Sequence, residues 1–204
     1  MTGEVQTAVF PAPAVDKKEI LRYAGARGSD DVLASLVDEC ISLAEDGFTY
    51  RVTYAVYPVT RTDTGVSLGF FTTASRDLAK NLDGCHAVVL FGASVGQTID
   101  RLVMREGVVS PAKALLLDAL GTERVEALAD AFCCNLAEAY EKDGYALRPR
   151  FSPGYGDLPL STQKELFSVL ELPKRLGVTL NDSLLMSPKK SVTAFVGIAP
   201  KEKK

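Results

Sequence analysis

An arginine, a proline, a glycine and a tyrosine occur within six residues, in the segment 150–155. Pro153 presets φ at the second position of a turn, and Gly154 accepts the positive φ that a type II turn requires next. Arg150 is a fixed cation whose planar fork matches a carboxylate. Gly154 lets a ligand approach bare backbone, and Tyr155 offers an apolar face with a polar tip. The segment predicts either a ligand-binding turn or a plain surface turn with a solvated arginine.

The pattern Arg-x-x-Pro-Gly-Tyr at 150–155, followed by Ser-Thr-Gln-Lys at 161–164, resembles the S-adenosylmethionine-binding segment of the activation (reactivation) domain of cobalamin-dependent methionine synthase. The likeness continues downstream over 180–183, 186–188 and 191–193, and upstream over 117–121 and 125–132. It is specific over residues 90–197 and weak over residues 1–90. We therefore expect a single activation-like domain over residues 1–204, as a stand-alone short homologue.

This resemblance implies a function. The chain would bind S-adenosylmethionine and support reductive methylation of cobalamin, which a separate methionine synthase or corrinoid protein would carry. A flavodoxin-like protein would donate the electron, so the chain would be part of a split methionine synthase. The cofactors do the chemistry and the protein supplies binding and orientation, so no residue is expected to be catalytic.

The resemblance also assigns roles to single residues. Arg150 would meet the methionine carboxylate, and backbone groups of Ser152 and Gly154 would hold the adenine or the amino-acid end. Tyr155 would lie towards the corrin. Asp130 falls where the family uses a glutamate, which can bind the α-ammonium or balance the sulfonium charge. Because the aspartate is one methylene shorter, a solvated helix charge is an equal alternative.

Two other functions remain open. The first is a non-catalytic scaffold that binds S-adenosylmethionine or docks a corrinoid protein, which the shorter Asp130 and the lack of an aromatic residue near Lys204 favour. The second is a methyltransferase with a different substrate, although the usual Gly-x-Gly loop after a first strand is missing. The chain has no Asp-x-His-x-x-Gly cobalamin signature of its own.

Composition excludes several further classes. The net charge of −3 gives no electrostatic footprint for nucleic acid. The four cysteines have no framework spacing, and His86 is the single histidine, so a metal site built by this chain is not expected. Without a signal peptide or an apolar membrane span, we expect a cytoplasmic protein with no membrane partner.

Periodicity and capping signals predict interspersed helices and strands. An extended arm covers 1–15, and a glycine-rich turn over 92–96 is read as close packing, with phosphate binding as the alternative. In the first half, helices are expected over 16–23, from a cap at Ser29 to a stop at Gly47, from a cap at Ser75 to just before Asp83, and after Gly96. In the second half, they are expected over 111–119, 123–142, 162–170 and 173–177, with Ser161 as the cap of the helix over 162–170. A half-exposed strand is expected over 48–57, followed by a turn at 62–65 and a second strand over 66–71. A central, buried strand is expected over 85–91, and a last strand over 192–198.

This mixture indicates an α+β or mixed α/β domain. The resemblance narrows the fold class to α+β, with a bent, mainly antiparallel sheet flanked by helices, as in the methionine synthase activation domain.

Overall fold

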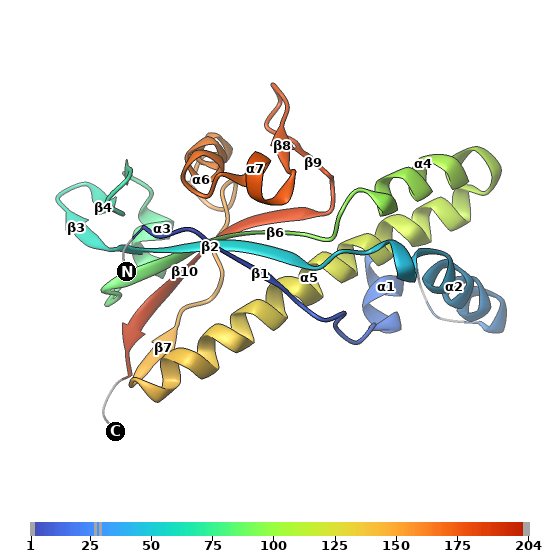
Figure 1. The fold of residues 1–204 in the computed structure, drawn as a ribbon, viewed down its shortest axis with the longest axis horizontal. Coiled ribbons are helices and arrows are strands. Elements are labelled where there is room, and N and C mark those ends of the chain that lie inside the picture. Colours follow the sequence, from blue (N-terminus) through green and yellow to red (C-terminus); the bar gives the residue numbers. More distant parts are fainter. Residues whose placement is uncertain (1–2, 27, 29, 202–204) are drawn as a thin grey trace.

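A five-stranded antiparallel sheet forms the centre of the protein, with strand order β1-β2-β6-β10-β7 (Figure 1). The computed structural model describes residues 3–26, 28 and 30–201. The strands are β1 (Gln6–Val9), β2 (Arg51–Pro58), β6 (Ala87–Ser94), β7 (Tyr145–Leu147) and β10 (Ser191–Pro200). Smaller antiparallel sheets contain β3 (Thr60–Thr62), β4 (Gly65–Ser67) and β5 (Thr72–Thr73), and β8 (Thr179–Leu180) and β9 (Met186–Ser187). The bent antiparallel sheet confirms the expected α+β class.

Helices cover both faces of this sheet (Figure 1). The long helix α5 (Pro111–Lys142) lies on one face with α1 (Lys17–Tyr23), α2 (Asp31–Ala44) and α4 (Thr98–Val109). The other face carries α3 (Arg76–Asn81), α6 (Gln163–Val169) and α7 (Leu172–Leu176). Each face has its own hydrophobic core. A sheet with two packed faces is therefore the frame that positions the site.

The two central strands are buried on both faces. Along β6, Val89 and Phe91 belong to the core under α5, whereas Val88 and Leu90 belong to the opposite core. The expected central strand is thus confirmed. The strand expected at 48–57 is present as β2, but its expected half-exposure was wrong, because Ala55 is buried under the second layer of helices. Alternation of polar and apolar residues did not reveal this because alanine and threonine pack well on a covered face.

Helix α5 runs without interruption through residues expected to separate two helices. The sequence predicted one helix that ends at Ala119 and a second that Thr122 caps, but Gly121 lies within α5 and serves close packing. A Cβ on Gly121 would lie 2.9 Å from both Ile99 Cγ1 and Lys190 Cγ. The next residue, Thr122, donates its hydroxyl to Asp118 O at 3.1 Å and accepts from Lys190 Nζ at 2.9 Å. Thr122 is therefore a mid-helix residue and not a cap.

Gly121→Ala is expected to lower the free energy of unfolding by about 1–2 kcal/mol. Overpacking costs about 1–3 kcal/mol, which exceeds the gain of up to about 1 kcal/mol in helix propensity. Gly107→Ala in α4 is the matched control, because its Cβ would lie 3.9 Å from the nearest atom outside its own helix backbone. Urea unfolding should show opposite signs for the two variants, and equal stabilisation would contradict the packing role of Gly121.

The N-terminal arm is extended where the structure describes it, as expected. Part of it is β1, which pairs with β2 at the sheet edge. Further along, the guanidinium of Arg124 donates to Pro13 O at 2.6 Å and to Ala14 O at 2.7 Å. Arg124 is buried and paired with the neighbouring Glu123. The arm is therefore fastened to α5 at the residue directly before Val125 and Glu126, which line the site.

Several boundaries differ from the sequence prediction. Asp30 caps α2 through a bond to Leu33 N, while Ser29 lies outside the described residues. Helix α6 begins after a 3-10 turn and has no cap from Ser161. Residues 92–94 continue β6, so the turn expected at 92–96 was too long. The expected close packing is confirmed, because a Cβ on Gly92 would lie 2.7 Å from Leu172 Cδ2. The turn at 62–65 joins β3 to β4, but β4 is shorter than the expected strand over 66–71. Strands β7, β8 and β9 were not anticipated.

Candidate functional site

The segment that carries Arg-x-x-Pro-Gly-Tyr continues from β7 along β10. Arg148 N donates to Gly197 O at 2.8 Å, and Phe151 exchanges two backbone hydrogen bonds with Phe195 at 2.9 and 2.8 Å. Pro149 has no N–H to give, and its carbonyl accepts from Asn81 Nδ2 at 3.1 Å. The rigid central strand β10 therefore fixes the backbone on which Arg150 is mounted.

The turn itself has the predicted form. Gly154 has φ +91°, and Tyr155 N donates to Ser152 O at 3.2 Å. The loop is then held by Asp157, whose carboxylate accepts from Ser75 Oγ and from Arg76 N at 2.8 Å. These hydrogen bonds lower the pKa of Asp157, so it stays ionised at neutral pH. The turn is therefore ordered before any ligand arrives.

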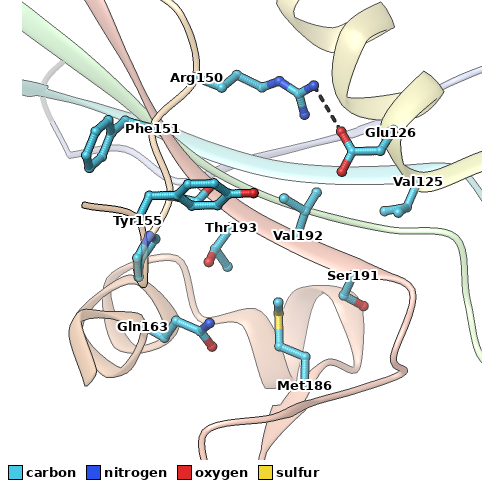
Figure 2. A pocket seen from close by; sticks show the side chains of 12 residues that line it. Val125, Glu126, Arg150, Phe151, Tyr155, Gln163, Met186, Ser191, Val192 and Thr193 are labelled. Atoms are coloured by element: carbon cyan, nitrogen blue, oxygen red, sulfur yellow. Dashed lines mark hydrogen bonds and ion pairs between the residues drawn. The ribbon is translucent and has the colours of Figure 1, made fainter. Parts of the chain in front are cut away.

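A cavity of about 520 Å³ lies beside this turn (Figure 2). Its size is in the range of small-molecule sites, about 300–1,000 Å³. Four separate parts of the chain form the wall: α5, the motif segment, the start of α6, and the run from β9 into β10. The lining residues are Val125, Glu126, Arg150, Phe151, Ser152, Pro153, Tyr155, Gln163, Met186, Ser191, Val192 and Thr193.

Arg150 lies against α5 within this wall. Its guanidinium bonds Glu126 Oε2 at 3.0 Å and Asp130 Oδ1 at 2.8 Å. Burial lowers the pKa of Arg150, but the charges of Glu126 and Asp130 outweigh this, and the pKa is raised above its ordinary value. Arg150 is therefore a permanent cation, and its orientation is set by two carboxylates before a ligand binds.

Glu126 and Asp130 stand one helical turn apart, but only Glu126 lines the cavity. The side chain of Asp130 is 69% exposed, whereas that of Glu126 is 38% exposed. Sequence reasoning selected Asp130 and missed Glu126. The i, i+4 spacing could have revealed it, because residues four apart lie on the same helix face. The structure brings Asp130 to the guanidinium from the outer side, and the carboxylate facing the cavity is Glu126.

The other predicted residues occupy different parts of the rim. Ser152 and Tyr155 line the cavity, and Tyr155 is 69% exposed at its mouth (Figure 2). Gly154 is also exposed, but it is not part of the wall, and its N–H donates to Leu158 O at 2.9 Å. A ligand could therefore meet the Gly154 carbonyl more easily than its N–H.

Several wall residues were given no role by the sequence, among them Gln163, Met186 and Thr193. The motif supplied no signal for Met186 and Thr193 beyond their position in the downstream likeness. Gln163 lies inside the Ser-Thr-Gln-Lys segment that carried part of the resemblance. Its neighbours Thr162 and Lys164 are not among the residues of the wall.

Neither a thiol nor the histidine is among the residues that line this cavity. Burial raises the pKa of Cys133 to about 11, so it is a protonated thiol at neutral pH. His86 is an exposed residue at the start of β6, against Tyr145. Among the residues that the structure describes, no three His, Cys, Asp or Glu side chains gather as a metal site would require. None of the described helices is both long enough and apolar enough to span a membrane.

Comparison with known proteins agrees with this fold. Residues 125–204 match the family described as vitamin B12 dependent methionine synthase, activation domain. A solved structure described as the MetH reactivation domain bound to AdoHcy superimposes with a TM-score of 0.68 at 18% sequence identity. That alignment covers 98% of this chain and 80% of the solved one. No curated protein matches the chain significantly.

The whole chain shares its α+β fold, with a bent antiparallel sheet, with that solved domain. Residues 125–204 are in addition similar in sequence to the activation domain of vitamin B12 dependent methionine synthase. The family match begins on α5 at Val125 and covers the motif turn, α6 and β10, and so includes every segment that lines the cavity.

Proposed function

We propose that this chain binds S-adenosylmethionine in the cavity beside the 150–155 turn and supports reductive methylation of cobalamin carried by a partner protein. The observation that carries the proposal is the position of Arg150, whose guanidinium is held in the wall of a cavity of suitable size. The family match and the S-adenosylhomocysteine named for the structural relative support the same ligand class.

The charges around Arg150 suit the amino-acid end of this ligand. The α-carboxylate would pair with Arg150. The α-ammonium would pair with Glu126, the carboxylate that lies 3.0 Å from the Arg150 guanidinium. Asp130, on the outer side of the guanidinium, would still neutralise the charge of Arg150 when the Glu126 carboxylate pairs with the ammonium. Backbone groups of Ser152 and Gly154 would hold a further part of the ligand, and Tyr155 would face the partner.

A partner's cobalamin in the Co(II) state would first take one electron from a flavodoxin-like donor. It would then accept the methyl group from the sulfonium, and S-adenosylhomocysteine would be left. The role of this chain is to bind, orient and present the methyl group. The exposed rim at Tyr155 suits that role because a bound ligand remains accessible from outside. The corrinoid protein and the electron donor would be separate chains, and the domain would cover residues 1–204 as one unit.

Binding itself is tested by calorimetry of the purified chain with S-adenosylmethionine in the presence of a chelator. We expect saturable binding of one ligand per chain without added metal. A chain that takes up no S-adenosylmethionine or S-adenosylhomocysteine at millimolar concentration would remove the basis of the proposal.

The purified chain should be colourless and should stay so after incubation with free cobalamin and gel filtration. Its cavity is sized for a nucleoside-sized ligand and opens at Tyr155 onto a surface, which suits contact with a corrin that another protein holds. Absorbance spectra after gel filtration measure this. If a corrin spectrum co-elutes with the chain, the proposal that a separate partner protein carries the cobalamin is contradicted.

A scaffold without turnover is the second candidate. The outward position of Asp130, which leaves a single carboxylate in the wall, is the observation that favours it. Binding of S-adenosylmethionine is common to both candidates, and methyl transfer separates them.

A further inference from the structure

Gln163 is the buried polar side chain of the cavity wall that lacks a partner. It is 6% exposed, and its Oε1 has no hydrogen-bond partner among the described residues. A buried amide group without a partner costs about 1–3 kcal/mol. Unpaired groups of this kind in a native protein call for an explanation, and a ligand that supplies the partner is one.

The position of Gln163 points to one end of the ligand. Figure 2 shows Gln163 and Arg150 at opposite ends of the group of lining side chains, with Tyr155 and Thr193 between them. Gln163 extends from α6 towards Thr193 and Met186. If Arg150 takes the α-carboxylate, the far end of an S-adenosylmethionine molecule, its adenine, lies at Gln163.

Adenine has the groups that a glutamine amide can satisfy. Its 6-amino group donates to an amide oxygen while a ring nitrogen accepts from the amide N–H, the pairing that glutamine makes with adenine in DNA recognition. The neighbouring Met186 supplies a polarizable thioether, which packs favourably beside an aromatic ring. Since the two ends of a carboxamide exchange by a half turn, Gln163 can turn either end to the ring.

We propose that Gln163 recognises the 6-amino edge of the adenine of the bound nucleoside and makes the cavity selective for it. This inference rests on the proposed function, because it takes Arg150 as the site of the carboxylate. It assigns the nucleoside end to a side chain of α6, in addition to backbone groups of the 150–155 turn.

The test compares S-adenosylhomocysteine with its 6-deamino analogue, in which purine replaces adenine. Calorimetry should show that the wild-type chain binds the analogue about tenfold more weakly, because a site built for an N–H group is left with an unpaired atom. Gln163→Met keeps the length and volume of the side chain but loses the amide. It should bind S-adenosylhomocysteine about tenfold more weakly than the wild type and should discriminate less than threefold between the two ligands.

Gln6→Leu is the matched control. Gln6 is an exposed glutamine of β1 whose side-chain oxygen accepts from the Tyr54 hydroxyl at 2.6 Å, and it lies outside this cavity. Its loss should leave both affinities unchanged. Wild-type binding without discrimination, or discrimination kept by Gln163→Met, would overturn the role of Gln163. Failure of the wild type to bind either ligand would overturn the proposed function itself, so the two failures are distinct.

A second measurement needs no ligand. Without ligand, Gln163→Met should raise the melting temperature by about 2–6 °C, because an unpaired buried amide is replaced by an apolar group of similar size. Saturating S-adenosylhomocysteine should raise the melting temperature of the wild type by more than that of the variant. A variant that melts below the wild type without ligand would show that the amide is bonded within the free protein, and this would overturn the inference.

Discussion

Tyr155→Ala is expected to slow methyl transfer to a partner's cobalamin about a hundredfold while leaving the affinity for S-adenosylmethionine nearly unchanged. The ring is 69% exposed at the mouth of the cavity, where a partner can contact it. Small displacements spoil the geometry of a transfer between two bound groups, and losing orientation alone can cost this much. The effect should therefore fall on the rate and not on the dissociation constant.

The assay follows the absorbance of a partner's reduced Co(I) corrinoid after adding S-adenosylmethionine and this chain. Tyr155→Phe should keep most of the rate because it keeps the ring. Val108→Ala removes an exposed apolar side chain from α4, outside the cavity wall, and should have no effect. If the wild type does not accelerate the loss of Co(I) with any of several corrinoid partners, the scaffold becomes the better description. Equal loss of affinity and rate in Tyr155→Ala would place the ring on the ligand instead.

Arg150→Ala is expected to weaken S-adenosylmethionine binding by about 1.5–3 kcal/mol, or roughly 10- to 150-fold in Kd. The variant loses a charge-assisted bond to the carboxylate. It also leaves Glu126 and Asp130 without their shared cation, so that unbalanced negative charge lies near the incoming carboxylate. The loss should consequently lie in the upper part of this range at low salt and shrink as salt screens the repulsion.

Two variants make this test specific. Arg148→Ala removes the same charge two residues earlier, from a side chain that bonds Asp83 O at 2.8 Å outside the cavity, and should not change the affinity. Arg150→Lys keeps the charge but loses the planar fork, so its affinity should fall between those of the wild type and the alanine variant. Calorimetric titrations with equal Kd for the wild type and Arg150→Ala would remove Arg150 from the site.

The sequence alone predicted much of the local structure and identified the motif. The caps at Asp16 and Ser75, the type II turn at Pro153-Gly154 and the central strand at 85–91 all follow from signals within a few residues. The Arg-x-x-Pro-Gly-Tyr pattern led to the resemblance, which a family match finds again over residues 125–204, and to the fold class, which the solved relative confirms. These features were readable because turn, cap and periodicity preferences act over short stretches of chain.

Tertiary structure decided what local preference could not. Two helices were predicted over 111–119 and 123–142, yet α5 is continuous. The packing of Ile99 and Lys190 against Gly121 favours a glycine within it. Ala55 looks like the exposed side of a strand until the second layer of helices covers it. In both cases the partner lies far away in the chain, so no short window contains the cause.

The site shows the same division. The sequence singled out Arg150 and Tyr155, which share one turn, and the resemblance offered Asp130 as a carboxylate for the ligand, with a solvated helix charge as the alternative. Only the packing of α5 against the motif segment brings Glu126 to the cavity side of the guanidinium and leaves Asp130 on the outer side. Only the approach of α6 buries Gln163 in the same wall with its amide oxygen unpaired. Which side of a cation a carboxylate occupies depends on the angle between two distant elements, and tertiary packing alone sets that angle.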